Sequence, residues 1–206
     1  ITWFGLFVVI VIYGAPVGLL LTRDRSPATI RISMWSGLFL LLTLSIFSNL
    51  FTPLKSTAAI LVVVALAVLA LLLTWILIKR RSIPLRPKRR NWSGLPKTGW
   101  FLVAALVVVS IWWLVAATRA PTNYDSGLYH IQAIWYAADF KTIPGLVNLY
   151  ASLGFGNSLM PLTAITTNGP MGLEAYRVIN GFFFLLLFVE VLLRLSSSRR
   201  NSVGTK

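Results

Sequence analysis

Five long apolar runs constrain this chain more than any other feature of its sequence. A helix needs about 20 mostly apolar residues to cross the hydrocarbon core of a membrane. Five runs approach that length: Trp3–Leu21, Met34–Phe51, Thr57–Ile78, Trp100–Ala117 and Tyr176–Leu195. Because lipid offers the backbone no hydrogen bonds, each run is predicted to be a helix. We therefore expect an all-α fold of about five polytopic transmembrane helices, with a juxtamembrane amphipathic helix in the long external loop.

The composition excludes several other classes of protein. Hydrophobic residues make up 57% of the chain and charged residues 12%, whereas soluble domains carry about 25% charged residues. This excludes an ordinary soluble enzyme and a disordered chain. With no cysteine and a single histidine, the chain has no disulfides, thiolate zinc sites or histidine clusters. The net charge of +14 is spread between the apolar runs, so the expected partner is the lipid bilayer and no nucleic acid.

The basic residues predict the orientation in the membrane. Most Lys and Arg residues lie in the first and third loops and in the C-terminal tail. By the positive-inside rule, the N-terminus is expected outside and the C-terminus in the cytoplasm. The chain then divides into three parts. Residues 1–99 form a three-helix membrane region with a basic cytoplasmic loop at 79–99, residues 100–195 hold the fourth and fifth spans with an external loop at 118–175, and residues 196–206 form a basic cytoplasmic tail.

One stretch of the external loop is apolar but too short to span. Residues Gly154–Asn168 include Asn157, Pro161 and several threonines. We interpret this stretch as a re-entrant or interfacial segment.

The external loop also contains an amphipathic pattern between Ser126 and Asp139. At about 100° per residue, one side is apolar (Leu128, Ile131, Ile134, Trp135 and Ala138) and another arc is polar (Asp125, Tyr129, Gln132, Tyr136 and Asp139). The pattern predicts a helix that lies in the outer interface of the membrane.

Asp125 has a structural as well as a functional interpretation. It precedes the predicted helix, where a carboxylate can cap the first turn, although Asn123 could take that role instead. On a regular helix, Asp125 and His130 lie about 140° apart and do not face each other. Asp125 and Tyr129, at positions i and i+4, do face each other.

These residues bring the sequence close to a known group of enzymes. A carboxylate just after a transmembrane helix, followed by short juxtamembrane helices in a large external loop, resembles the GT-C membrane glycosyltransferases. The strings NYDSGLYHIQAI, IPGLVNLYASLGFGNS and VINGFFFLLLF more closely resemble a family of uncharacterised bacterial polytopic proteins described as glycosyltransferase-like. The resemblance covers Pro121 to about Phe188. Because GT-C enzymes usually carry the carboxylate after their first span and have more spans downstream, we expect this chain to be a fragment.

The resemblance implies transfer of a sugar from a polyprenyl-phosphate donor on the extracytoplasmic side of a bacterial inner or plasma membrane. It assigns Asp125 as the general base or the group that orients the acceptor, and it includes His130 in the motif as a second candidate catalytic residue.

Four further residues are candidates for binding the substrate. Arg119 and Arg177 flank the external loop and could stabilise charge on the leaving phosphate. Asp139 is the second-choice carboxylate, and Tyr129 could stack on a sugar. The fourth and fifth helices could line a groove for the lipid tail of the donor. No cofactor motif is evident, although one carboxylate and a substrate phosphate could together hold Mg²⁺.

Two alternatives remain open at this point. A transporter or flippase subunit for lipid-linked sugars would use Glu190, or the broken segment around Gly154–Pro161, as a midplane site. A non-catalytic membrane scaffold would need no site. Glu190 and Arg194 are one helical turn apart in the fifth run, so we expect them to form an ion pair.

Overall fold

The computed structural model describes residues 2–22, 26–80, 97–117, 119, 121–154 and 156–203. Its long helices are α1 (Thr2–Thr22), α2 (Pro27–Phe51), α3 (Thr57–Arg80), α4 (Lys97–Ala117) and α7 (Tyr176–Val203). Each contains a stretch that is long and apolar enough to cross a membrane. This confirms the expected all-α, polytopic architecture, and the chain is a multi-pass integral membrane protein.

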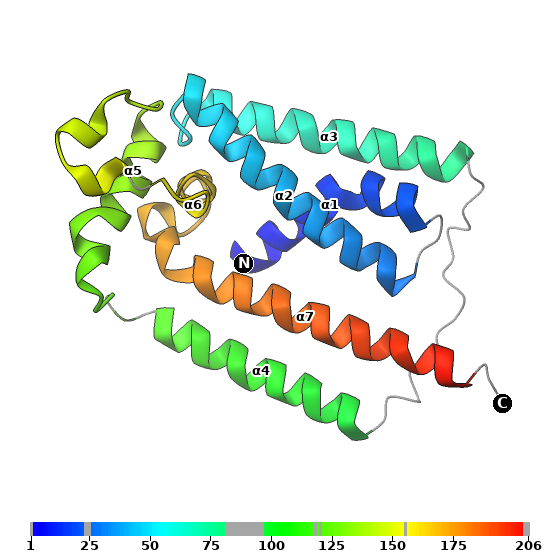
Figure 1. The fold of residues 1–206 in the computed structure, drawn as a ribbon. Helices are drawn as coiled ribbons and strands as arrows, with labels where there is room; N and C mark the ends of the chain where they lie inside the picture. Colours follow the sequence, from blue (N-terminus) through cyan, green and yellow to red (C-terminus); the bar gives the residue numbers. More distant parts are fainter. Residues whose placement is uncertain are drawn as a thin grey trace.

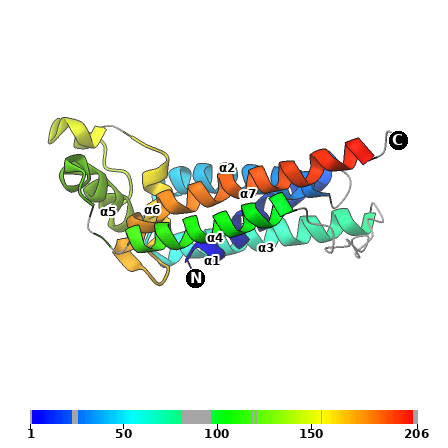
Figure 2. The ribbon, with the colours of Figure 1, turned by 90° about the horizontal axis from the view of Figure 1, so that it is seen from below.

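The five long helices run side by side and alternate in direction (Figures 1 and 2). At one end, called here the loop end, lie the start of α1, the connection between α2 and α3, and residues 121–175. At the other, called here the basic end, lie the start of α2, which contains Arg31, the end of α3, which contains Lys79 and Arg80, and the C-terminal part of α7, which contains Arg194. The long loop is therefore separated from these basic residues by the full length of the bundle, as five spans require. The side of the membrane on which each end lies is still a prediction.

Glycines allow α1 and α2 to cross at very short range. A Cβ atom added to Gly14 would lie 1.7 Å from the Ser33 carbonyl oxygen, and one added to Gly37 would lie 1.6 Å from the Ile10 carbonyl oxygen. Gly18 is similarly close to the Ser33 side chain. Gly14 and Gly18 are spaced four apart, as in the small-residue motifs that pack transmembrane helices. Any larger residue at these positions forces the two helices apart.

The start of α2 differs from the sequence prediction. The helix begins at Pro27 rather than at Met34. Ser26 caps it by accepting a hydrogen bond from the Thr29 backbone N–H, and Pro27 fits the first turn, where no N–H is needed. The first residues of α2 are too polar to be counted in the apolar run, but the cap at Ser26 and Pro27 allows the helix to begin before that run. As a result Arg31 lies inside α2 rather than in a loop.

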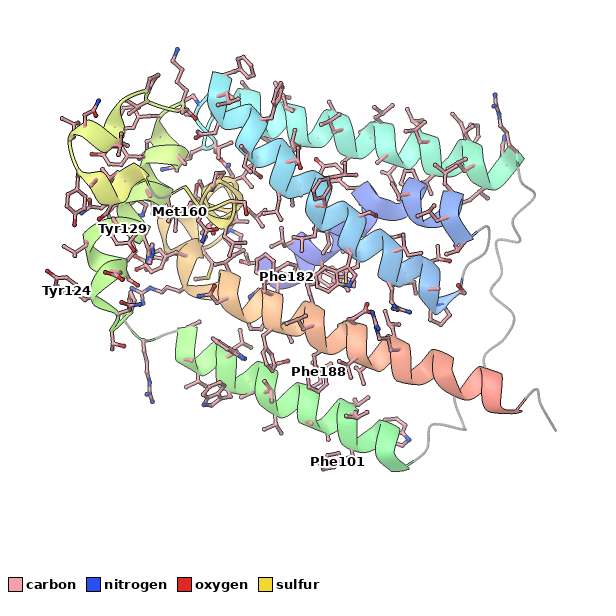
Figure 3. All side chains as sticks on the ribbon, in the orientation of Figure 1. Phe101, Tyr124, Tyr129, Met160, Phe182 and Phe188 are labelled. Atoms are coloured by element: carbon pink, nitrogen blue, oxygen red, sulfur yellow. The ribbon has the colours of Figure 1, made fainter. Side chains whose placement is uncertain are left out.

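The core of the bundle is built by α1, α2 and α7. Phe182 of α7 is buried at its centre (Figure 3), together with Ile10 and Met34. The indole N–H of Trp3 donates to the Val178 carbonyl oxygen at 2.8 Å. The ring of Trp3 also occupies the space beside Gly181, where an added Cβ would lie 2.6 Å from it. The first and last long helices are therefore joined directly.

The two remaining long helices pack on the outside of this core. In α3, the Val63 carbonyl oxygen accepts a hydrogen bond from the Tyr13 hydroxyl at 2.7 Å. Helix α4 lies against α7 (Figure 1), where the rings of Trp113 and Phe184 are 5.9 Å apart. None of the apolar window of α4 is buried within the protein. Most of its surface therefore faces outward, as Phe101 does in Figure 3.

The long loop folds into short helical elements. They are the π-helix η2 (Ser126–His130), α5 (Ile131–Asp139), the 3₁₀ turns η3 (Leu146–Asn148) and η4 (Ala151–Gly154), α6 (Leu159–Thr166) and the 3₁₀ turn η5 (Gly172–Ala175). Helix α6 is too short to span a membrane, in agreement with the interpretation of its segment. It is partly buried through Leu162, Thr163 and Ala164 against α2 and α5.

Asparagines attach the short helices to the end of α2 and to the connection between α2 and α3. The buried side chain of Asn49 donates from Nδ2 to the carbonyl oxygens of Ala137 and Phe140, both at 3.0 Å. The Nδ2 atom of Asn168 donates to the Leu54 carbonyl oxygen at 2.8 Å. Backbone carbonyls at helix ends need such partners. These bonds fix α5 and α6 relative to the bundle.

Candidate functional site

Asp125 lies at the start of η2, but its carboxylate does not cap that helix. The capping role belongs to Asn123, whose Oδ1 accepts a hydrogen bond from the Asp125 backbone N–H at 3.0 Å. The half-buried Asp125 carboxylate makes no hydrogen bond or ion pair within the part of the chain that the structure describes. Of the two roles that the sequence left open for Asp125, capping is therefore excluded.

The turn that follows Asp125 is a π-helix, not the regular helix that the periodicity predicted. The backbone N–H of Ile131 donates to the carbonyl oxygen of Ser126, five residues earlier. A π-turn is wider than an α-turn, so residues five apart lie closer to the same face than on a regular helix. The expectation that Asp125 and His130 point well away from each other was based on α-helical geometry and does not apply here. Such turns are rare and occur often at functional sites.

Tyr129 and His130 form an aromatic pair on this turn. Their ring centroids are 4.2 Å apart with an interplanar angle of 59°. Tyr124, just before Asp125, is 78% exposed and points away from the bundle (Figure 3). Three of the predicted site residues, Asp125, Tyr129 and His130, thus lie together on one turn at the loop end.

Asp139 and Arg119 lie outside this turn. Asp139 is the last residue of α5 and is exposed. Arg119 is also exposed, and its backbone N–H donates to the Ala116 carbonyl oxygen at the end of α4. Neither side chain is bonded to Asp125 in the described structure. The amphipathic pattern of α5 is partly as predicted. Ile134 and Ala138 are buried and Gln132 and Asp139 are exposed, but Trp135, which was expected on the apolar side, is 40% exposed.

Arg177 lies in the first turn of α7, where it already has partners. Its Nε forms an ion pair with the carboxylate of Glu174, and its guanidinium lies over the Tyr176 ring, 5.7 Å from the centroid. It lies in the segment next to α5, because the Trp135 indole N–H donates to the Leu173 carbonyl oxygen at 3.5 Å. A phosphate bound here would compete with Glu174 for the guanidinium.

A second carboxylate, Glu190, is bound very differently. It is 8% exposed and lies on α7 against the first part of α2. Its Oε1 accepts hydrogen bonds from the Nε of Arg31 at 2.9 Å and from the Nε of Arg194 at 2.5 Å. Its Oε2 accepts from the Trp35 indole N–H at 3.1 Å. The predicted pair with Arg194 is confirmed, and two further donors come from α2. We call these four residues the Glu190 cluster.

Two grooves open between the transmembrane helices. One of about 420 Å³ lies between α1, α2 and α3, with Tyr13, Phe47 and Ala70 in its wall. The other, of about 300 Å³, lies between α1, α3 and the residues that follow α6, with Val9, Val64 and Asn168 in its wall. Between α4 and α7, the fourth and fifth spans, the rings of Trp113 and Phe184 are 5.9 Å apart, and neither of these two grooves lies there. Both observed grooves lie on the opposite side of the core.

No group of three or more acidic, histidine or cysteine residues comes together within the described segments. If a divalent metal binds, Asp125 would be one ligand and a substrate phosphate would supply others.

The chain also matches a family model. The model describes a domain of unknown function, DUF8201, and it matches residues 1–205. The chain belongs to the DUF8201 family. No curated protein and no solved structure matches it.

Sequence reasoning missed two partners of Glu190 in this DUF8201 chain, Arg31 and Trp35. Both bind Glu190 from more than 150 residues away in the sequence. The available signal was an arginine and a tryptophan spaced one turn apart next to the second apolar run. It does not stand out, because Arg31 precedes the apolar run and a tryptophan at the edge of a span is typical of the membrane interface.

Proposed function

We propose that this integral membrane protein belongs to a glycosyltransferase-like machinery that transfers a sugar from a polyprenyl-phosphate carrier on the extracytoplasmic side. One observation carries the proposal. Among the described residues, the Asp125 carboxylate neither caps its π-turn nor forms an ion pair, and it lies beside an aromatic pair at the loop end of the bundle. A carboxylate without a structural partner is available to accept a proton or to orient a hydroxyl.

The reaction would proceed in one displacement at the anomeric carbon. The oxygen of an acceptor hydroxyl forms a bond to that carbon, and the hydroxyl proton passes to the Asp125 carboxylate. The bond between the anomeric carbon and the phosphate oxygen breaks, and its electron pair leaves with the polyprenyl phosphate. Arg119 and Arg177 would stabilise the negative charge on that phosphate.

The remaining residues of the turn would hold the sugar. Tyr129 offers an aromatic face against which a sugar ring can pack, and His130 stacks beside it. His130 would then orient the acceptor or exchange a proton with it.

The flippase or transporter alternative has less support. It relied on Glu190 as a midplane site, but Glu190 is bound by three donors. A carboxylate that must bind and release a cargo during each cycle needs a coordination position that can be vacated. The other proposed site, the segment around Gly154–Pro161, has only the end of η4 and the start of the short helix α6 among its described residues.

The test compares Asp125→Asn with Asp139→Asn. Both remove one carboxylate charge from the same amphipathic segment. Membranes containing the full-length protein are supplied with undecaprenyl phosphate that carries a radiolabelled hexose, and label that leaves the lipid fraction is counted. We expect Asp125→Asn to lower transfer by at least about 10²-fold, with insertion into the membrane unchanged. Asp139→Asn is expected to keep most of the activity. Full activity of Asp125→Asn contradicts the proposal.

A further inference from the structure

A run of exposed apolar residues follows α5. We call residues 140–150 the apolar segment, because five large apolar side chains are exposed on it: Phe140, Ile143, Val147, Leu149 and Tyr150. Leu149, at 82%, is the most exposed large apolar residue that the structure describes. The turns η3 and η4 in and after this segment contact chiefly each other. An exposed apolar surface of this kind marks a site that binds a protein or a membrane.

The apolar face of α5, in contrast, is used inside the protein. Of the residues predicted to turn toward the membrane, Ile134 and Ala138 pack with Leu54 and Ala164 instead. The exposed apolar surface of the loop therefore lies on the segment after α5 rather than on these two residues of the helix.

Hydrogen bonds fix where the apolar segment begins relative to the membrane spans. Asn49, in the last turn of α2, donates from Nδ2 to the Phe140 carbonyl oxygen at 3.0 Å. Its own carbonyl oxygen accepts from the Thr142 backbone N–H at 2.7 Å. Leu50 and Phe51, the next two residues of that span, are exposed on its outward surface. The apolar segment thus starts at the depth where a span ends, beside the connection from α2 to α3 (Figure 1).

The backbone of the segment is suited to a place with little water. Backbone N–H groups are costly to bury unless they have a partner. After the left-handed turn at Gly145, the backbone N–H of Asn148 donates to the Gly145 carbonyl oxygen at 2.9 Å, and that of Leu149 donates to the Leu146 carbonyl oxygen at 3.1 Å. These local bonds lower the cost of moving the turn out of water.

The charge of the segment favours lipid headgroups. Lys141 is the only charged residue from position 140 to position 158, and it is exposed. A lysine beside exposed apolar side chains is attracted to anionic lipids while those side chains enter the membrane surface.

We propose that the apolar segment is a membrane-surface anchor. Leu149 and the neighbouring exposed side chains enter the boundary between headgroups and acyl chains, in the leaflet at the loop end. The partner is the same lipid bilayer that holds the five spans. The anchor involves neither Asp125 nor the sugar-transfer reaction, so it goes beyond the proposed function and is tested without it.

The test places a fluorescent reporter on the segment. The chain has no cysteine, so Asn148→Cys, at an exposed position, takes a single nitrobenzoxadiazole dye. The full-length protein is placed in vesicles of phosphatidylethanolamine and phosphatidylglycerol. We expect strong quenching by a lipid that carries a nitroxide near its headgroup, and weak quenching by aqueous iodide. Quenching by iodide alone overturns the proposal. Val108→Cys, exposed in the middle of α4, is the reference for a reporter deep in the acyl chains.

Two variants separate an anchor from chance proximity to the bilayer. With the reporter at position 148, Val147→Asn together with Leu149→Asn removes the apolar side chains on both sides of it. Lipid quenching should then fall at least about twofold. Tyr124→Asn removes a similarly exposed apolar side chain from the same loop and should leave the quenching unchanged. Unchanged quenching in the double variant, or an equal fall in Tyr124→Asn, contradicts the anchor.

Other occupants of the surface give different results. If neither quencher reaches the reporter, protein covers the segment, and lipid is excluded as its partner. In vesicles of purified protein that cover is a second copy when iodide quenching returns in nanodiscs that hold one copy each. An anchored chain that transfers no sugar contradicts the proposed function and leaves the anchor intact.

Discussion

The carboxylates of Asp125 and Glu190 have opposite surroundings in this structure. Glu190 lies between two transmembrane helices and is bonded by three side chains from α2 and α7. Asp125 lies at the loop end, and neither a cap nor an ion pair engages it in the described segments. A buried charge must be paired to be tolerated, whereas a carboxylate that exchanges protons must be accessible. The contrast separates a structural carboxylate from one that is available for chemistry.

The largest expected effect is on stability. Glu190→Ala leaves Arg31 and Arg194 close together without their shared counter-ion, so we expect a loss of about 3–5 kcal/mol in the free energy of unfolding. Asp125→Ala should change it by less than about 0.5 kcal/mol. Both are measured by unfolding in mixed micelles with increasing SDS. Equal losses in the two variants would remove the distinction between the carboxylates.

The second largest effect is expected on sugar transfer, when the geometry of the π-turn is changed. Deleting Gly127 removes one residue and should convert η2 into a regular helical turn, which rotates His130 by about 100° relative to Asp125. We expect sugar transfer to fall about 10²-fold. Gly127→Ala is the matched control, because an added Cβ meets no atom within 4 Å, and its activity should stay within about twofold. Equal activities would show that the π-turn does not position the site.

The bond from Trp35 to Glu190 gives a smaller change. Trp35→Phe removes the only donor to Oε2 among the described residues, which should cost about 1.5–3 kcal/mol of unfolding free energy. Trp112→Phe, at a tryptophan that faces outward from α4, should cost less than about 0.5 kcal/mol. The same unfolding experiment measures both variants, and a neutral Trp35→Phe would mean that two arginines suffice for Glu190.

A labelling experiment tests the separation of the two ends without perturbing either. The chain has no cysteine, so Thr122→Cys at the loop end and Arg80→Cys at the basic end each give a single reporter. Both positions are exposed. A membrane-impermeant maleimide should label Thr122→Cys in intact cells and Arg80→Cys only after lysis. The reverse pattern places Asp125 in the cytoplasm and contradicts the proposed donor. Labelling of both in intact cells contradicts the five-span topology.

The bundle itself was largely predictable from the sequence. Lipid forces apolar runs of sufficient length into helices, so the five spans and the non-spanning nature of α6 followed from length and hydropathy alone. The beginning of α2 was missed because hydropathy does not register a Ser26 cap. The pairing of Glu190 with Arg194 was predicted because the two lie within one turn.

The site was less predictable, for two physical reasons. The bonds from Arg31 and Trp35 to Glu190 depend on how α2 packs against α7, and no local pattern encodes that contact. In the π-turn after Asp125 the backbone hydrogen bond spans five residues, one more than in an α-turn. The apolar spacing around this turn nevertheless fits a regular helix. Local periodicity therefore identified the correct segment but not the π-turn within it.

The packing of Trp3 against Gly181 has a consequence for how the chain is assembled during synthesis. The glycine crossing of α1 and α2 involves only the first two spans, so this hairpin can form soon after they leave the ribosome. The indole of Trp3, however, has its partners on α7. Helix α1 is thus inserted into the membrane well before α7, but it reaches its final lateral position only after α7 has joined it.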